Sequence, residues 1–367
     1  MGKPHLQGGL LASLTSNVGT ARLMHLHAVL AQASLVVIGG STGGLEALRT
    51  IIAALPDDFP GTICVVIHTA PEAPGLLDQI LSRSGSIRAT YAIDGEPIRP
   101  AHIFIAPPNR HLLINGSHLR VTSGPRENRF RPAIDPLFRT AGTSHRGAIG
   151  VLISGGQDDG VAGLLALKAN GGVAIVQDPA DAIAPRLPEA ALEQVVVDYV
   201  LSARDIPTVI SGLVRVASPE KTELTPSTRE VADPADHGTD RIHRADEMGP
   251  PSPFTCPECG GTLWEIKQGE ISRFSCHVGH RYTSESLAAA QGVELEQAMW
   301  SALRALEEAS ELRRRMARRA YDKGMSAIGD AYAEQAADHE ERARVVREAL
   351  MPKTSSREKA EFPVGNS

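Results

Sequence analysis

The chain has 367 residues, enough for two or three domains, and its 37 Lys and Arg against 43 Asp and Glu give a net charge of −6. This balance excludes a general affinity for nucleic acid or for an anionic membrane surface. No apolar segment approaches the roughly 20 residues that a membrane-spanning helix needs, and the N-terminus does not read as a signal peptide. The four cysteines suit a reducing cytoplasm better than a disulfide framework.

Residues 1–33 show no clear period and are interpreted as an N-terminal extension. From 34 to 216, strand patterns alternate with helix patterns, as in an α/β domain. Several of these strands are continuously apolar, which indicates parallel strands covered on both faces, so we expect a doubly wound, mainly parallel sheet. The expected strands are 34–39, 62–68, 102–106, 148–154, 172–177 and 197–201, and the expected helices are 44–55, 74–84, 134–145, 160–169 and 205–216.

The segment Leu35–Leu48 joins an apolar strand to a helix through a glycine-rich turn. Ser41 lies in that turn, where a hydroxyl stands above the sheet and the next helix directs its N-terminal amides at a ligand. This pattern suits a nucleophile with a nearby oxyanion site. A phosphate or nucleotide cradle is the alternative, although the G-x-G-x-x-G spacing is not met and Leu45 stands where a P-loop has lysine.

A serine nucleophile needs a general base, and His68 ends the second expected strand. Parallel neighbours bring their C-terminal ends to one rim of a sheet, so we expect His68 beside Ser41. The loop after the strand 148–154 repeats the strand–glycine–helix pattern and supplies Asp158 and Asp159, either of which could orient His68. Each feature has a structural alternative: a satisfied polar histidine, and a turn with a helix N-cap. Only their convergence on one rim favours catalysis.

Several stretches carry a resemblance to a known family: Gly40-Ser41-Thr42-Gly43-Gly44, His68, the loop 155–160, the segment Arg131-Pro132-Ala133-Ile134-Asp135-Pro136-Leu137-Phe138-Arg139, and the segment 171–190. Together they resemble the catalytic domain of the CheB-type chemotaxis protein-glutamate methylesterases, over about 34–216. The resemblance implies Ser41 as nucleophile, His68 as base and Asp159, rather than Asp158, as the orienting carboxylate. It implies no cofactor for catalysis.

The reaction that the resemblance implies is hydrolysis of glutamate γ-methyl esters on the cytoplasmic helices of methylated chemoreceptors, with release of methanol. Family members can also deamidate receptor glutamines. Candidate oxyanion donors are the amides near Thr42 and Gly43 and those of residues 155–157. Arg131 is either a contact for the acidic receptor surface or a structural arginine. The rival function is a catalytically weak methylesterase fold that serves as a scaffold in a signalling pathway.

The chain departs from the family pattern in two places. The usual member carries an N-terminal phosphoacceptor receiver domain, for which residues 1–33 are too short, so control by phosphorylation is not assumed. The family also commonly has methionine in the aspartate loop where this chain has Gly156, which implies a more flexible loop.

Residues 217–252 are rich in Pro, Glu, Asp, Thr and Ser and are interpreted as a disordered linker. The segment 253–283 follows, and its spacing of cysteine and histidine predicts a structural Zn²⁺ site in a small zinc-ribbon-like module. The expected ligands are Cys256, Cys259, Cys276 and His280, with His277 as the alternative histidine and a reduced, metal-free knuckle as the alternative state. This module resembles an extension found on some stand-alone methylesterase-like proteins.

Residues 284–350 repeat apolar side chains at three- and four-residue steps, including Leu295, Leu303 and Leu312, with an interruption at Gly324. A helical hairpin followed by a flexible tail at 351–367 is the natural interpretation. The arginine-rich run 313–319 either meets a signalling partner or forms a solvated face, and the latter is favoured because glutamates alternate with it. Nucleic-acid binding and membrane insertion are not expected.

Overall fold

The computed structural model describes residues 35–216, 251–268 and 271–351. The expectations for the N-terminal extension, for most of the linker and for most of the tail fall outside the described residues. The chain divides into two compact units after Leu287. Among the described helices, none is both long and apolar enough to cross a membrane.

A seven-stranded parallel sheet forms the centre of the first unit, in the order β3-β4-β2-β1-β7-β8-β9. Every residue of the two strands β1 and β2 is buried, as their unbroken apolar sequences predict. The expectation of a doubly wound α/β fold is confirmed. The strands are β1 (Leu35–Gly40), β2 (Thr62–Ile67), β3 (Arg88–Tyr91), β4 (His102–Ile105), β7 (Ile149–Leu152), β8 (Val173–Gln177) and β9 (Tyr199–Leu201).

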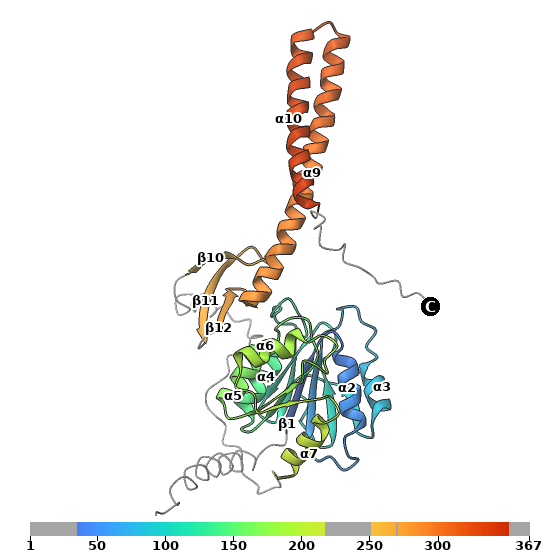
Figure 1. The fold of residues 1–367 in the computed structure, drawn as a ribbon, viewed down its shortest axis with the longest axis vertical. Coiled ribbons are helices and arrows are strands. Elements are labelled where there is room, and N and C mark those ends of the chain that lie inside the picture. Colours follow the sequence, from blue (N-terminus) through green and yellow to red (C-terminus); the bar gives the residue numbers. More distant parts are fainter. Residues whose placement is uncertain (1–34, 217–250, 269–270, 352–367) are drawn as a thin grey trace, which may run out of the picture. The chain divides into compact units, whose positions relative to one another are not determined.

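Helices cover both faces of this sheet because alternate side chains of each strand point to opposite faces. Val36 and Ile38 of β1 pack on one side, whereas Leu35 and Val37 pack on the other. The first side is covered by α2 (Gly44–Ala53), α3 (Leu77–Ser84) and α7 (Ile206–Val216), and the second by α4 (Ile134–Ser144), α5 (Val161–Ala169) and α6 (Arg186–Gln194) (Figure 1).

Four elements within residues 35–216 are not among those expected from the sequence. The edge strand β3 is short and carries polar side chains, and α6 contains Pro188, so neither shows a strong period. The antiparallel hairpin of β5 (His111–Asn115) and β6 (His118–Thr122) does carry a signal, because Gly116 turns the chain with φ of 56° after Asn115. An Asn-Gly pair between two apolar runs is therefore a hairpin signal in this sequence.

The glycines at the end of β1 serve close packing. A methyl group on Gly39 would lie 2.2 Å from Cγ2 of Ile134, and one on Gly40 would lie 2.6 Å from Cγ1 of Ile153. Gly43, the N-cap of α2, adopts φ of 72°, a left-handed conformation that favours glycine. The sequence therefore needs glycine here so that α4 and the loop after β7 can approach β1.

A second, antiparallel sheet follows residue 250, in the order β10-β11-β12-β13. Leu263 and Phe274 are buried in it, while Trp264 and Ile266 are half-buried. Its strands are β10 (Pro251–Thr255), β11 (Thr262–Gln268), β12 (Ile271–Cys276) and β13 (Arg281–Thr283).

The expected helical hairpin is present as α9 (Ser284–Asp322) and α10 (Ser326–Leu350), and Gly324 turns the chain with φ of 72°. Its core is made mainly of small side chains, and the hydroxyl of Ser310 donates to the carbonyl of Ala336 at 3.0 Å. Leu295 and Leu312 are exposed, so the expected apolar stripe is wrong at those two positions. Because the core residues are mostly alanines, the helices approach closely and larger leucines elsewhere on α9 remain outside.

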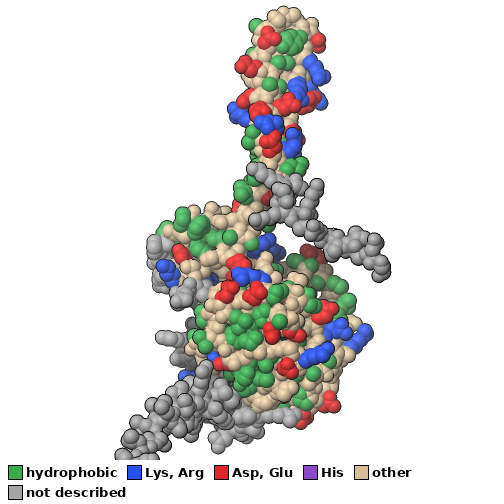
Figure 2. Space-filling view, viewed as in Figure 1, with side chains coloured by type: hydrophobic (Ala, Val, Ile, Leu, Met, Phe, Trp, Pro, Cys, Tyr) green, Lys and Arg blue, Asp and Glu red, His purple; other side chains and the backbone are tan. Residues whose placement is uncertain are grey.

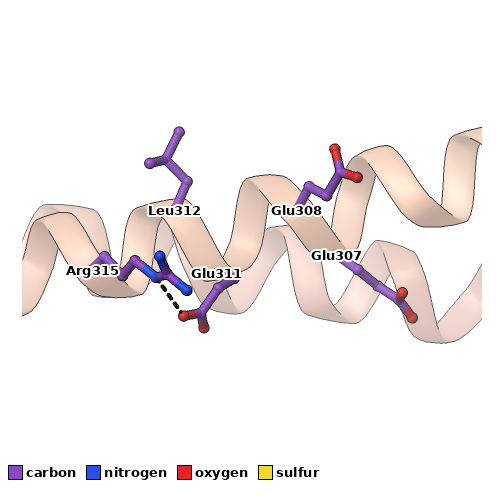
Figure 3. Close-up of a pocket in the computed structure, with 5 residues that line it drawn as sticks. All are labelled: Glu307, Glu308, Glu311, Leu312 and Arg315. Carbon is purple, nitrogen blue, oxygen red and sulfur yellow. Dashed lines mark hydrogen bonds and ion pairs between the residues drawn. The ribbon is translucent and has the colours of Figure 1, made fainter.

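The surface of the hairpin mixes both signs of charge (Figure 2). Arg313 donates to Gln335 at 2.7 Å, Arg314 pairs with Glu340, and Arg315 pairs with Glu311 at 2.8 Å, which supports the solvated-face interpretation. A shallow depression of about 420 Å³ on α9 is lined by Glu307, Glu308, Glu311, Leu312 and Arg315 (Figure 3).

Substituting Gly39 with alanine tests the packing at the end of β1. We expect Gly39→Ala to lower the free energy of unfolding by about 2 kcal/mol, because the new methyl group overlaps Ile134. Urea unfolding measures this. Gly212→Ala is the matched control: Gly212 lies within α7 with nothing within 4 Å of the added carbon, so this variant should gain about 0.5–1 kcal/mol. Equal stability of the two variants would contradict the packing.

Candidate functional site

Ser41 lies immediately after β1, beyond the carboxyl-terminal ends of the parallel strands, at the point where the strand order reverses. β1 pairs with β2 on one side and with β7 on the other, and the Ser41 amide donates to the carbonyl of Ser154 at 2.9 Å. In doubly wound folds, ligands bind in the crevice at this reversal, outside the carboxyl ends of the strands. Ser41 therefore lies where ligands bind in folds of this topology.

His68 follows β2, and the structure brings its ring to Ser41. The amide of His68 donates to the carbonyl of Gly40 at 3.1 Å, which aligns the two loops. Nδ1 of His68 lies 3.2 Å from Oγ of Ser41. Phe130 stacks on the imidazole with ring centroids 3.6 Å apart and planes 14° apart, a contact that the sequence did not indicate. The ring is thus held in one orientation by a hydrogen bond and by stacking.

Asp159 completes the arrangement from the loop before α5. Its Oδ2 lies 2.8 Å from Nε2 of His68, and the residue is 1% exposed. Oδ2 also accepts from the amide of Ile134 at 2.6 Å, and Oδ1 accepts from the side chain of Asn128 at 2.9 Å. A carboxylate that accepts from Nε2 leaves the lone pair of Nδ1 facing Ser41, which is the tautomer a general base needs.

The sequence pattern alone left Asp158 as an alternative partner for His68, but the structure gives this side chain other contacts. Its side chain interacts with Thr283 rather than with His68, and one of its oxygens is buried without a partner among the described residues. Burial is the main cause that raises the pKa of Asp158 to about 6; the nearby Glu285, Asp135 and Asp159 act in the same direction, and the hydrogen bond with Thr283 opposes them. The structure thus brings Asp159, not Asp158, to the imidazole.

A second carboxylate, on Asp135, faces Asp159 across the two helix N-termini. The amides at the start of α4 donate to Asp159, while Asp135, in the first turn of α4, accepts from the amides of Gly160 and Gly163 at 3.1 and 2.5 Å at the start of α5. Asp159 therefore caps the N-terminus of α4, and Asp135 caps the N-terminus of α5. An acid at a helix N-terminus is favoured by the unpaired amides and by the helix dipole.

Four of the five candidate amides near Ser41 are available to an oxyanion. The amide of Gly155 is excluded, because it donates to the carbonyl of Ala184 at 2.9 Å. Those of Thr42, Gly43, Gly156 and Gln157 have no hydrogen-bond acceptor within residues 35–216, 251–268 and 271–351. The two loops face each other, since a methyl group at Gly156 would lie 4.0 Å from Oγ1 of Thr42. Paired amides beside a nucleophile are the usual form of an oxyanion hole.

The geometry of the turn does not favour a phosphate cradle. Such a cradle needs several free amides, but those of Ser41 and Gly44 donate to the carbonyls of Ser154 and Ser41 at 2.9 and 2.8 Å. The turn is also covered: a methyl group on Gly43 would lie 2.6 Å from Cβ of Ile183. The glycines admit neighbouring side chains rather than a ligand.

The side chain of Arg131 makes hydrogen bonds within its own domain. Its guanidinium donates to Oδ1 of Asn109 at 2.8 and 3.0 Å and to the carbonyls of Ser123 and Gly124 at 3.0 and 2.9 Å. Four bonds to neighbouring loops favour the structural alternative for this residue over a contact with a substrate protein.

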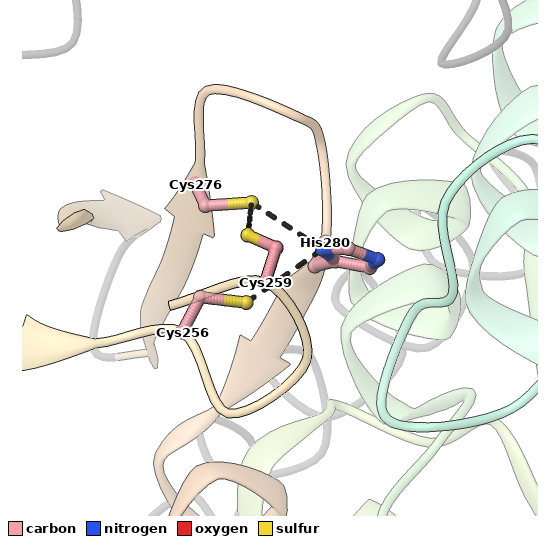
Figure 4. Close-up of side chains that lie close together, drawn as sticks. All are labelled: Cys256, Cys259, Cys276 and His280. Atoms are coloured by element: carbon pink, nitrogen blue, oxygen red, sulfur yellow. Dashed lines mark hydrogen bonds between the residues drawn. The ribbon is translucent and has the colours of Figure 1, made fainter. Parts of the chain in front are cut away.

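The cysteines and the histidine expected to bind metal converge at the end of the second sheet (Figure 4). The donor atoms of Cys256, Cys259, Cys276 and His280 lie within 4.8 Å of one another. Cys259 and Cys276 have sulfurs 3.7 Å apart, and Nδ1 of His280 lies 3.5 and 3.6 Å from two sulfurs. Zn–S bonds of about 2.3 Å in a tetrahedron place sulfurs about 3.8 Å apart, so these residues fit the ion. His277 lies outside the cluster.

The second nitrogen of His280 supports the same interpretation. Nε2 lies 3.5 Å from Oε2 of Glu258, which is one of the two residues between Cys256 and Cys259. A carboxylate on the far nitrogen of a ligating histidine orients the ring and raises its basicity. The four donors thus have an outer partner of the kind that metal-binding histidines use.

Serine, histidine and aspartate held in series at the rim of a parallel sheet form the arrangement that serine hydrolases use. Comparison with known proteins identifies the family. The CheB methylesterase family model matches residues 36–210. A Leptospira interrogans protein named for protein-glutamate methylesterase and protein-glutamine glutaminase activity is 40% identical over 173 residues, which is 47% of this chain and 90% of the relative. The chain belongs to the CheB methylesterase family.

Other relatives extend the same comparison. Protein-glutamate methylesterase/protein-glutamine glutaminase 5 of Anaeromyxobacter dehalogenans is 36% identical over 220 residues, covering 58% of this chain and 60% of the relative. The crystal structure of the Thermotoga maritima CheB methylesterase catalytic domain is 32% identical, with a TM-score of 0.48 over 50% of this chain and 99% of that one.

The raised pKa of Asp158 predicts how stability depends on pH. Its folded-state pKa of about 6 lies above its ordinary value of 3.8, so its contribution to stability is complete below about pH 4 and is lost as the pH rises through 6. Asp158→Asn cannot ionise. We therefore expect its free energy of unfolding, relative to that of the wild type, to be about 1–3 kcal/mol higher at pH 8 than at pH 4.5.

Urea unfolding at the two pH values measures this difference. Asp57→Asn, at an exposed carboxyl, controls for the loss of one negative charge. Parallel pH dependence of Asp158→Asn and the wild type would show that this carboxyl is not buried in the folded protein.

Proposed function

We propose that this chain is a protein-glutamate methylesterase that hydrolyses glutamate γ-methyl esters on the cytoplasmic helices of chemoreceptors and also deamidates receptor glutamines. The observation that carries the proposal is the position of His68 between Oγ of Ser41, at 3.2 Å, and Oδ2 of Asp159, at 2.8 Å. The names of the relatives support the substrate class. The reaction belongs to chemotaxis or a similar chemosensory pathway, in the cytoplasm where such receptor helices lie.

In this mechanism, Oγ of Ser41 attacks the ester carbonyl while Nδ1 of His68 takes the hydroxyl proton. Asp159 keeps the proton on Nε2 and stabilises the imidazolium that forms. The amides of Thr42 and Gly156 stabilise the charge on the tetrahedral intermediate. His68 then gives its proton to the departing methoxide, so methanol leaves and an acyl-enzyme remains. Water attacks this ester by the same path and restores Ser41 and the glutamate.

The scaffold alternative is less well supported, because a chain freed from catalysis has no need to keep this arrangement. Asp159 is desolvated and directed at His68, with its remaining lone pairs filled by Ile134 and Asn128. Such a buried polar network is costly unless all its members are satisfied, and it orients one imidazole for one hydroxyl.

Ser41→Ala should lower kcat for methanol release by at least about 10³-fold, and His68→Ala by a similar amount, because each removes a member of one relay. Asp159→Asn should cost about as much, since it favours the wrong tautomer of His68. The assay measures methanol released from a receptor fragment that carries glutamate γ-methyl esters.

The matched control for these variants is Asp158→Asn, which changes the neighbouring carboxyl in the same way and should keep kcat within a fewfold of the wild type. Circular dichroism checks that each variant is folded. Undiminished turnover by folded Ser41→Ala would rule out the serine mechanism.

We also propose that Cys256, Cys259, Cys276 and His280 hold a structural Zn²⁺ that stabilises the sheet β10–β13. The donor distances support this site, and the small core of that sheet needs such a link. The ion has no part in the hydrolytic steps described above.

Elemental analysis should find one Zn²⁺ per chain, and Cys276→Ser should lower that content, because it removes one of four ligands. Cys64→Ala is the matched control: Cys64 is buried within β2, so this variant should keep the metal. Chelation should speed hydrogen exchange in β10–β13 and leave β1, β2 and β7 protected. A metal-free protein with a fully protected second sheet would contradict the site.

A further inference from the structure

A buried polar cluster behind His68 draws side chains from two parts of the first compact unit. Four of its acids are at most 3% exposed: Glu127, Asp135, Asp158 and Asp159. The arginines that pair with members of this cluster, within the described parts of the chain, are Arg139 of α4, Arg273 of β12 and Arg281 of β13. Two of these three cations therefore come from the second sheet, β10–β13, which we call the cysteine-rich sheet. Only Arg139 comes from residues 35–216, the hydrolase domain.

Arg273 is the cation that pairs with Asp135, the carboxylate that shares Asn128 with Asp159. It donates to Oδ2 of Asp135, and both side chains are buried. Burial raises the pKa of Asp135, and Asp159 and Glu127 raise it further, whereas Arg273 opposes them. Without Arg273, a buried carboxylate would lack its closest counter-charge, which is costly in a desolvated site.

Asn128 links this ion pair to Asp159. Its Nδ2 donates to Oδ2 of Asp135 at 3.0 Å and to Oδ1 of Asp159 at 2.9 Å. Its Oδ1 accepts from the amide of Thr283 at 3.1 Å and from the hydroxyl of Ser286 at 3.0 Å. Both ends of the carboxamide are thus occupied, so its orientation is fixed. One end is held by β13 and the start of α9, and the other holds Asp159.

We propose that Arg273, Thr283 and Ser286 are positioning residues for hydrolysis, acting through Asp135 and Asn128 to hold Asp159 against His68. The cysteine-rich sheet thereby forms part of the structure that aligns the catalytic groups, although none of these three residues touches the reacting atoms. The inference rests on the proposed function for its kinetic test but has a spectroscopic test that does not.

The main test compares Arg273→Met with Arg273→Lys in the full-length chain. Loss of the charge-assisted hydrogen bond should lower kcat for methanol release by about 10- to 100-fold and leave KM within about twofold. Arg273→Lys keeps the charge and should recover most of kcat. Lys267→Met, at an exposed cation on the neighbouring strand β11, is the matched control and should behave as the wild type.

A second readout is the low-field proton resonance of the His68 Nε2–H that faces Asp159. It should shift or broaden in Arg273→Met and stay unchanged in Lys267→Met, because only the former disturbs the acceptor of that proton. Wild-type kcat together with a wild-type resonance in Arg273→Met would overturn the proposal. If the wild type releases no methanol, the proposed function fails, while the resonance still decides the positioning role.

A double-mutant cycle tests the route through Asp135. If Arg273 acts through this carboxylate, Arg273→Met should lower kcat little further in an Asp135→Asn background. Independent, multiplicative losses would overturn that route. Should Arg273→Met fail to fold, Ser286→Ala removes one of the two donors to Asn128, and it should lower kcat about fivefold with KM unchanged. An unchanged kcat in that variant would count equally against the proposal.

Discussion

The reciprocal capping of α4 and α5 by Asp159 and Asp135 determines the geometry of the whole site. Each carboxylate accepts amides at the start of one helix, so the two N-termini and the two acids occupy fixed positions relative to each other. Hydrogen bonds to a charged acceptor contribute about 1.5–3 kcal/mol each, more than neutral ones. Since α4 and α5 also pack on the same face of the sheet, the position of Asp159 is fixed by the backbone of the core and not by a loop alone.

This constraint also explains the glycines. Gly39 lets Ile134, the first residue of α4, approach β1, and Gly160 adopts φ of 105° just before α5. A larger residue at Gly39 would displace the start of α4, whose amide holds Asp159, so the packing of the core and the position of Asp159 depend on the same contact. The glycine-rich turns resemble phosphate-binding loops in composition, but here their function is close approach of backbone and side chains.

Much of the fold and the three principal side chains of the site could be predicted from the sequence, because they depend on local pattern and on one rule of topology. Continuous apolar runs identify parallel strands, and parallel strands place Ser41, His68 and the Asp158–Asp159 pair on one rim. Spacing could not separate Asp158 from Asp159, since adjacent residues in a turn differ in direction by details of φ and ψ. The choice came from the family resemblance.

The rest of the site could not be predicted because it depends on contacts between distant segments. Asp135 lies within the motif 131–139, and Asn128 precedes that motif. Nothing in the local sequence distinguishes a polar residue that holds another carboxylate from one that lies in a turn. Arg273 meets Asp135 across 138 positions, and no periodicity in either segment reports on such a pairing. Cysteine spacing predicted where the donor cluster lies, but not that the same sheet would carry a cation into the hydrolase core.

The position of the metal donors gives this pairing a mechanical basis. Cys276 ends β12 and His280 precedes β13, so two donors lie between Arg273 and Thr283 in the chain. The antiparallel pairing of the two strands places Arg273 opposite Thr283. A bound ion would therefore fix the turn that keeps both residues in register, one directed to Asp135 and the other to Asn128. Because an uncompensated buried carboxylate costs several kcal/mol, docking of the sheet and ionisation of the acids stabilise each other.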